Sequence, residues 1–224
     1  MPESNNLRER GSPAERLQAA AQALGCDLSA TQQARLLDYL AMMARWNKVY
    51  NLTAVRDPDE MLTLHLIDSL AVLPPLRRWL DAQAVRPARL LDVGSGAGLP
   101  GVVLAICCPE LSVTCVDTVG KKAAFIQQVA ATLKLPNLRG LHARVESLPQ
   151  GYDVVCSRAF ASLIDFVTWS AAALSPEGVW LAMKGKDPVE EMAVLPENID
   201  VFHVEQLAVP GLQADRCLVW MRRK

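Results

Sequence analysis

Four glycines lie within eight residues of the segment LLDVGSGAGLPG, which runs from Leu90 to Gly101. Glycine adopts positive φ angles easily and lets the backbone approach a ligand closely, so this loop after an apolar strand predicts a ligand site. Residues 96–101, GAGLPG, match the dinucleotide pattern GxGxxG. Residues 94–98, GSGAG, match the loop of S-adenosylmethionine (SAM) enzymes equally well. The loop alone therefore leaves two cofactors open.

Three features outside the glycines favour SAM over a nicotinamide or flavin cofactor. Pro100 removes an N–H from the start of the following helix, where a pyrophosphate would bind. Asp92 lies two residues before the first glycine, and a carboxylate suits the ammonium and sulfonium of SAM better than two phosphates. The late strand–strand ending of the chain resembles the C-terminal hairpin of class I methyltransferases. Asp117, which ends the next strand, would grip the ribose hydroxyls of either cofactor.

The residues before this loop predict helices up to about residue 80. A capping box at Ser29 begins one helix, and Asp57 followed by a proline begins another. Gly25 is predicted to end the first helix, and Pro74-Pro75 to end the last.

From residue 86 onward, short apolar strands alternate with helices. The predicted strands are ARLLDVG, LSVTCVD, LRGLHARV, YDVVCSRAF, VWLAMKG, VFHVEQLAV and RCLVWMR, with a turn at Pro176-Glu177-Gly178. Alternation of this kind predicts a doubly wound, mostly parallel sheet, and the last two strands predict an antiparallel hairpin. We therefore expect an α/β, Rossmann-like class I SAM-dependent methyltransferase domain over residues 86–224. An N-terminal helical extension precedes it over residues 1–85, with a disordered tail over residues 1–13.

Composition and charge argue against several other classes. The chain has 23 basic and 24 acidic residues and a formal net charge of −1, so no overall basic footprint for a nucleic acid is present. No apolar signal segment lies in the first ten residues, and no run of about eighteen apolar residues predicts a membrane span. The six cysteines lack CxxC spacing. They are expected to be buried thiols in a reducing cytoplasm, without a metal site.

Several longer strings, in this order, point to one family: RWNKVYNLTAVRDPDEMLTLHLIDSL, LLDVGSGAGLPGVVLAI, DTVGKKAAFIQQV, ARVESL, VCSRAFASL and MKGK. From about Leu36 to the C-terminus the chain resembles the RsmG (GidB-type) small-subunit ribosomal RNA guanine-N7 methyltransferases. The resemblance implies methyl transfer from SAM to N7 of a guanine in 16S ribosomal RNA. It implies as partner the small ribosomal subunit or an assembly intermediate, with no membrane and no obligate protein partner.

The resemblance also implies particular cofactor contacts. Gly94 and Leu99 belong to the loop, Val145 and Glu146 follow the third strand near the adenine, and Arg158 follows the fourth strand near the methionine end of SAM. With the loop and its acids, the predicted cofactor-binding residues are Asp92, Gly94, Ser95, Gly96, Gly98, Leu99, Asp117, Val145, Glu146 and Arg158.

The chemistry of the implied reaction requires no general base, because guanine N7 carries a free lone pair and no proton. Methyl transfer from a sulfonium is an in-line displacement in which the protein mainly supplies positioning. We therefore predict no proton-transfer residue, and name Arg158 and His65 as positioning candidates. Arg158 could instead form only a salt bridge at the sheet edge, and His65 could be a satisfied core residue.

RNA contacts are predicted from local features. Lys184 and Lys186 in MKGK follow the fifth strand, beside the expected cofactor mouth, where they could bind phosphates. Arg222 and Arg223 form a second basic cluster, and Asn51 could either cap a helix or reach the substrate.

Three other functions remain open on residues alone. A small-molecule methyltransferase would have a closed apolar pocket roofed by the N-terminal helices. An NAD-dependent oxidoreductase would bind nicotinamide, although no tyrosine here has a lysine at YxxxK spacing. A SAM-binding assembly factor without catalytic activity is the third alternative.

Overall fold

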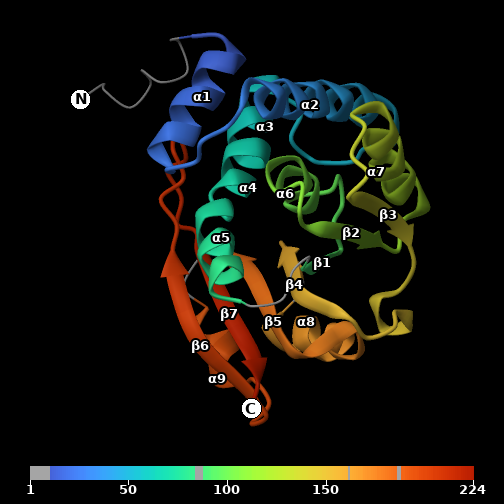
Figure 1. Cartoon of the computed structure of the whole chain (residues 1–224), viewed down its shortest axis with the longest axis vertical. Helices are drawn as coiled ribbons and strands as arrows, with labels where there is room; N and C mark the ends of the chain where they lie inside the picture. The colour runs from blue at the N-terminus through green and yellow to red at the C-terminus, as the bar shows by residue number, and fades with distance from the viewer. Residues whose placement is uncertain (1–10, 84–87, 161, 186–187) are drawn as a thin grey trace.

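Figure 1 shows a computed structural model of the chain, in which residues 11–83, 88–160, 162–185 and 188–224 are described. Its centre is a seven-stranded sheet with the order β3-β2-β1-β4-β5-β7-β6. The strands are β1 (Arg89–Val93), β2 (Ser112–Asp117), β3 (Leu138–His142), β4 (Tyr152–Arg158), β5 (Leu174–Lys184), β6 (Ile199–Gln206) and β7 (Cys217–Arg223). The first five pair in parallel, and β7 pairs antiparallel with both β5 and β6. The predicted mostly parallel sheet with an antiparallel C-terminal hairpin is confirmed.

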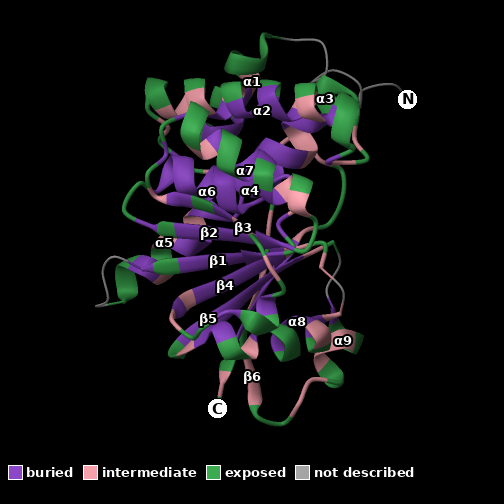
Figure 2. Ribbon diagram, turned by 90° about the vertical axis from the view of Figure 1, so that its right-hand side faces the viewer, coloured by how far each residue is buried: buried purple, intermediate pink, exposed green. Residues whose placement is uncertain are grey.

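Helices lie on both faces of this sheet. The N-terminal set is α1 (Pro13–Ala23), α2 (Ala30–Tyr50), α3 (Pro58–Met61), the π-helix η1 (Leu62–Ile67), α4 (Asp68–Leu70) and α5 (Leu73–Ala82). The later set is α6 (Gly101–Cys107), α7 (Gly120–Thr132), η2 (Val145–Ser147), α8 (Leu163–Ser170), η3 (Ala171–Ala173) and α9 (Val189–Ala193). In Figure 2, α6 and α7 cover one face beneath an outer layer of α1 and α2, and α8 lies on the other face.

The helix boundaries mostly follow the predicted caps. Ser29 forms the capping box of α2, the Asp57 carboxylate accepts the first N–H groups of α3, and Gly25 follows α1 with a φ of +68°. Pro74 and Pro75, expected to end a helix, instead lie in the first turn of α5. That correction has a simple cause, because first-turn N–H groups have no partner inside the helix and proline lacks that group.

The predicted turn at residues 176–178 is also corrected. These residues lie inside β5, which is continuous from Leu174 to Lys184. The pairing register with β4 shifts between Tyr152 and Val154, so β5 has extra residues at this point. The segment is therefore a bulge within a strand rather than a turn between elements.

The two faces of the sheet bury separate apolar clusters. Alternate strand residues such as Leu90, Val113 and Leu181 join one cluster that also contains buried residues of α1, α2, α4, α5 and α6. Their strand neighbours, such as Leu91 and Trp180, pack with α8 in the other cluster. Hence the N-terminal helices share a core with the sheet.

All six cysteines are buried free thiols, as predicted. The part of the chain that the structure describes contains no helix both long and apolar enough to cross a bilayer. Residues 1–10 of the predicted tail and the predicted boundary at 85/86 lie outside the described residues. The last residues of that tail are described, and Ser12 caps α1.

Candidate active site

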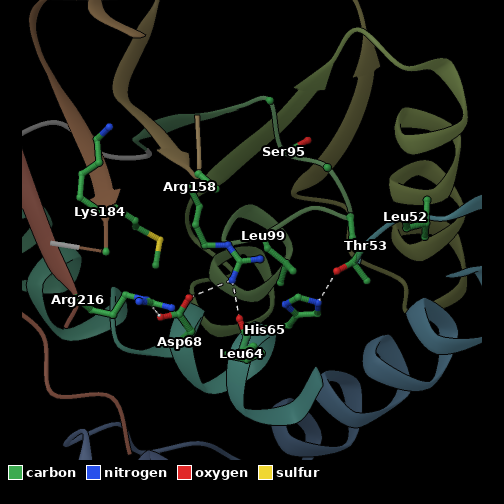
Figure 3. Close-up of a pocket in the computed structure, with 16 residues that line it drawn as sticks. Leu52, Thr53, Leu64, His65, Asp68, Ser95, Leu99, Arg158, Lys184 and Arg216 are labelled. Carbon is green, nitrogen blue, oxygen red and sulfur yellow. Dashed lines mark hydrogen bonds and ion pairs between the residues drawn. The ribbon is translucent and has the colours of Figure 1, made fainter. Parts of the chain in front are cut away.

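A cavity of about 560 Å³ opens at the carboxyl ends of the parallel strands. Figure 3 shows the side chains that surround it. The lining residues are Leu52, Thr53, Leu64, His65, Asp68, Gly94, Ser95, Gly96, Ala97, Leu99, Arg158, Ala159, Met183, Lys184, Gly185 and Arg216. Ligands of open α/β sheets bind at this edge, and small-molecule sites have volumes of about 300–1,000 Å³. The glycine loop and the N-terminal helices therefore wall a cavity of the right size for a cofactor.

The glycine loop turns sharply because three of its glycines have positive φ. The angles at Gly94, Gly96 and Gly98 are +64°, +58° and +93°, and a Cβ on Gly98 would collide with the Val102 side chain. The Tyr39 hydroxyl of α2 donates to the Ala97 carbonyl at 2.7 Å. The helical extension thus helps to hold the loop.

Six backbone N–H groups of this loop donate hydrogen bonds inside the protein. Gly94 and Ser95 donate to Val116 O, Gly96 donates to Asp117 Oδ2, and Gly98 and Leu99 donate to Ser95 O. Pro100 has no N–H, and Gly101 N donates to Asp92 Oδ2 at 2.9 Å. A pyrophosphate needs free N–H groups at the start of the helix, and these six are taken. The loop therefore fits SAM, which has no phosphate, better than a dinucleotide.

Asp92 lies below the loop and not on the cavity wall. It is completely buried, and burial raises the pKa of its carboxyl from 3.8 to about 7. One carboxyl oxygen accepts the Gly101 N–H, and the other has no partner among the described residues. Asp92 therefore shapes the turn into α6, while its predicted contact with the cofactor stays a prediction.

Asp117 joins the loop to the end of β2. Its carboxylate accepts Gly96 N–H at 3.0 Å and Val119 N–H at 2.8 Å. Neither Asp117 nor the pair Val145 and Glu146 lines the cavity. Val145 is buried and Glu146 is exposed on the short helix η2, after β3. The cavity thus covers the predicted methionine side of the cofactor site and stops short of the predicted adenosine side.

Arg158 projects from the end of the central strand β4 and meets the helical extension. Its Nη1 donates to Leu64 O at 2.7 Å and to Asp68 Oδ2 at 3.1 Å. In an α-helix Leu64 O would accept the N–H of Asp68, but in the π-helix η1 that N–H donates to Thr63 O and His65 O. The widened turn therefore leaves the Leu64 carbonyl available to Arg158.

His65 lies on the cavity wall but is only 5% exposed. Burial, with a further contribution from Arg158, lowers its pKa from 6.5 to about 4. Its Nε2 lies 2.9 Å from Thr53 Oγ1, whereas Nδ1 has no partner among the described residues. His65 is thus neutral at pH 7. It is buried like a core residue and also lies at the cavity, so each of the two predicted interpretations is partly right.

The predicted RNA contacts do not all lie at the cavity. Lys184 lines the cavity, and its ammonium donates to both carboxylate oxygens of Glu191 at 2.9 and 2.8 Å. Lys186 lies outside the described residues. Asn51 ends α2 in the left-handed conformation and accepts a bond from Arg56, so it is a helix cap and does not line the cavity.

Arg222 and Arg223 lie far from the cavity mouth, and their predicted contact with RNA stays a prediction. Cys217 pairs with Lys184 at the carboxyl end of β5, and β7 runs antiparallel from there toward the opposite end of the sheet. At about 3.3 Å per residue, Arg222 lies roughly 17 Å farther along. Arg222 pairs with Asp200, and Arg223 donates to Ala171 O.

Among the residues at or beside the cavity that were not predicted are Tyr39, Asp68 and Arg216. Asp68 follows His65 by three residues, the spacing of one helical face, and this was the available signal. Arg216 approaches Asp68 from 148 positions away, so local patterns carry no sign of their contact.

Comparison with solved structures defines the class of protein. A SAM-dependent methyltransferase from Aquifex aeolicus superposes with a TM-score of 0.52 at 18% identity, covering 74% of this chain and 98% of that one. The Thermus thermophilus 16S rRNA N2 G1207 methyltransferase RsmC, in complex with AdoMet and guanosine, gives 0.50 at 20% identity over 70% of this chain and 43% of its own. The fold is that of the SAM-dependent methyltransferases.

Sequence comparison identifies the family. The family described as GidB, rRNA small subunit methyltransferase G, matches residues 32–219. The ribosomal RNA small subunit methyltransferase G of Acidovorax sp. (strain JS42) is 66% identical over 211 residues, covering 92% of this chain and 93% of that protein. The chain belongs to the rRNA small subunit methyltransferase G family.

Proposed function

We propose that this protein transfers a methyl group from SAM to N7 of a guanine in 16S ribosomal RNA. Family membership supports the reaction and the class of substrate. The observation that carries the proposal at the site is the cavity where the glycine loop, Arg158 and His65 meet, and no described lining residue is poised to remove a proton. The substrate is the small ribosomal subunit or an assembly intermediate, in the cytoplasm.

The groups around the cavity fit an acceptor that has no proton to lose. Asp68 is the one carboxylate among the described lining residues, and two arginines hold it. His65, with its pKa near 4, is a weak base. Bound SAM supplies the electrophilic methyl group. Because guanine N7 presents a free lone pair, alignment of acceptor and donor is the main contribution required of the protein.

Several residues of the chain would hold the cofactor. Gly94, Ser95 and Leu99 form part of the cavity wall that the cofactor would contact. The Arg158 guanidinium would bind the methionine carboxylate. Asp117, Val145 and Glu146 would bind the adenosine side. The N-terminal helices, which carry His65 and Asp68, form one wall of this cavity.

Methyl transfer from labelled SAM to small ribosomal subunits tests the proposal. The subunits come from cells that lack this protein, with free RNA and buffer as controls, and the labelled nucleoside is identified after digestion. We expect label as 7-methylguanosine. Label on another nucleoside would contradict the assigned acceptor. SAM binding without label on any RNA would favour a small-molecule methyltransferase or a non-catalytic factor.

A further inference from the structure

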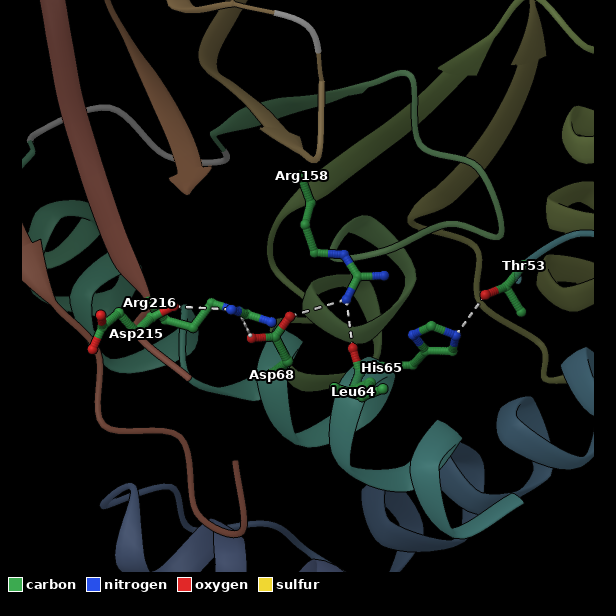
Figure 4. A network of polar contacts seen from close by, with 7 residues as sticks. All are labelled: Thr53, Leu64, His65, Asp68, Arg158, Asp215 and Arg216. Atoms are coloured by element: carbon green, nitrogen blue, oxygen red, sulfur yellow. Dashed lines mark hydrogen bonds and ion pairs between the residues drawn. The ribbon is translucent and has the colours of Figure 1, made fainter. Parts of the chain in front are cut away.

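One buried carboxylate holds two arginines at the cavity (Figure 4). Asp68, on α4, has a side chain that is only 3% exposed. Its Oδ2 accepts from Arg158 Nη1 at 3.1 Å, and its Oδ1 accepts from Arg216 Nε at 2.9 Å. Each carboxylate oxygen therefore serves a different guanidinium, and one side chain sets the positions of both.

Each arginine has a second fixed contact. Arg158 Nη1 also donates to Leu64 O at 2.7 Å, and Arg216 Nη1 donates to Asp215 O at 2.9 Å. Both arginines line the cavity, with side chains 19% and 23% exposed. Each guanidinium therefore makes hydrogen bonds within the protein, while its side chain still borders the cavity.

The two arginines border different sides of the cavity. Arg158 ends β4, and β4 neighbours β1, which leads into the glycine loop. Arg216 directly precedes β7 and lies beside Gly185, since a Cβ on that glycine would be 3.8 Å from Arg216 Nη1. In Figure 3, Arg216 lies with Lys184 on the side away from Ser95 and Thr53. Asp68 therefore connects the cofactor side of the cavity to the side formed by β5 and β7.

The charge balance of this network favours an anionic ligand. The members of the network that line the cavity, two guanidinium groups and one carboxylate, carry one net positive charge, whereas the Lys184 ammonium is matched by the Glu191 carboxylate. A guanidinium binds a phosphate through paired hydrogen bonds. An RNA strand that enters beside β5 and β7 would bring a phosphate to Arg216.

We propose that Asp68 is a positioning residue that holds Arg158 toward the cofactor and Arg216 toward a phosphate of the RNA next to the target guanine. The inference rests on the proposed function. It assigns to Asp68 a coupling between two binding subsites, which a purely structural carboxylate would not provide.

The test compares Asp68→Asn with Asp200→Asn. Asp200 accepts from Arg222 Nε at 2.9 Å, the same donor atom and distance as in the pair of Asp68 and Arg216, but away from the cavity. Three quantities are measured for each protein: the Kd for SAM by calorimetry, the KM for small subunits, and the dependence of RNA binding on salt. We expect Asp68→Asn to raise both the Kd and the KM about tenfold, and Asp200→Asn to leave both within about twofold.

Arg216→Gln separates the two subsites. It should raise the KM for RNA about tenfold, lower the salt slope by about one, and leave the Kd for SAM unchanged. In the double variant Asp68→Asn/Arg216→Gln, the RNA KM should not exceed that of the worse single variant, because both changes remove the same contact.

Several outcomes would overturn the inference. Asp68→Asn could behave like Asp200→Asn, the two changes could multiply in the double variant, or Arg216→Gln could leave the salt slope unchanged. If Asp68→Asn does not fold, Asp68→Glu keeps the charge and displaces it by one methylene, and wild-type constants for that variant would count against positioning. Absence of any methyl transfer to RNA by the wild-type protein is a different result, because it refutes the proposed function itself.

Discussion

At the scale of single residues, Asp92 shows how a buried charge couples the cofactor loop to pH. Its carboxyl is enclosed beneath the loop, and burial raises the pKa from 3.8 to about 7. Between these values the folded protein binds a proton that the unfolded chain has already released. Stability must therefore fall as pH rises from about 4 to about 7.

Asp92→Asn should remove this loss of stability. Each pKa unit corresponds to about 1.4 kcal/mol, and about two units of the shift lie above pH 5. The variant should therefore gain roughly 3 kcal/mol relative to wild type as the pH rises from 5 to 8. Its amide oxygen can still accept the Gly101 N–H. Urea unfolding of both proteins across this range measures the difference, and two parallel curves would refute the raised pKa.

His65 contributes a pH dependence of the opposite sign. Its pKa is lowered from 6.5 to about 4, so the unfolded chain binds the extra proton between these values. Stability from this group is lost as pH falls through that range. Both proteins in the Asp92 comparison retain His65, so its contribution cancels in their difference.

At the scale of elements, the helical extension acts on the cofactor loop through one hydroxyl. Tyr39 of α2 is fully buried and donates to Ala97 O. Burial holds the pKa of Tyr39 well above its usual range, so the hydroxyl stays protonated and donates. The extension is thereby part of the site and not only a cover for the sheet.

Tyr39→Phe should destabilise the protein and weaken SAM binding. Loss of the bond leaves the Ala97 carbonyl without its partner in a buried position, which costs about 1–3 kcal/mol. The free energy of unfolding and the Kd for SAM are measured together. Tyr50→Phe, on the exposed end of the same helix, is the control and should match wild type. A wild-type Kd for Tyr39→Phe would show that the hydrogen bond from the extension to the loop does not affect SAM binding.

Local sequence signals predicted the elements that depend on neighbouring residues. The caps at Ser29 and Asp57, the loop glycines and the late hairpin all depend on short spacings, and they are confirmed. The π-helix was missed because Leu62 to Ile67 reads as an ordinary apolar helix. The Leu64 carbonyl accepts from Arg158, which lies 94 positions away in the sequence, so no local pattern indicates this contact.

Charged residues are the hardest to place from the sequence, because a cluster of charged residues does not show at which end or on which face of the sheet it lies. Arg222 and Arg223 are predicted as a second basic cluster for RNA, but the sequence does not show that the antiparallel course of β7 carries them to the far end of the sheet from the cavity. Asp68 and Arg216 were overlooked although they meet at the cavity. Contacts of this kind follow from topology rather than from spacing along the chain.

At the scale of the whole molecule, the helical extension and the sheet share one core. Leu36, Leu66 and Leu76 belong to the same buried cluster as Leu104 and Leu181. Trp79 of α5 stacks on Trp220 of β7 with ring centroids 6.3 Å apart. The helical extension buries its apolar side chains in a cluster shared with the sheet, so it has no separate core on which to fold independently.

We therefore expect one cooperative unfolding transition for the whole chain. Tryptophan fluorescence, far-ultraviolet circular dichroism and calorimetry should give coincident midpoints, with the calorimetric enthalpy equal to the van 't Hoff enthalpy. SAM should shift this single midpoint upward, since a ligand that binds only the folded state stabilises everything that folds with its site. Two resolved transitions, with only the later one moved by SAM, would instead establish the extension as a separate folding unit. Because Tyr39, His65 and Asp68 all come from the extension and meet the cofactor cavity or its loop, such a separation would also leave the site incomplete whenever the extension opened.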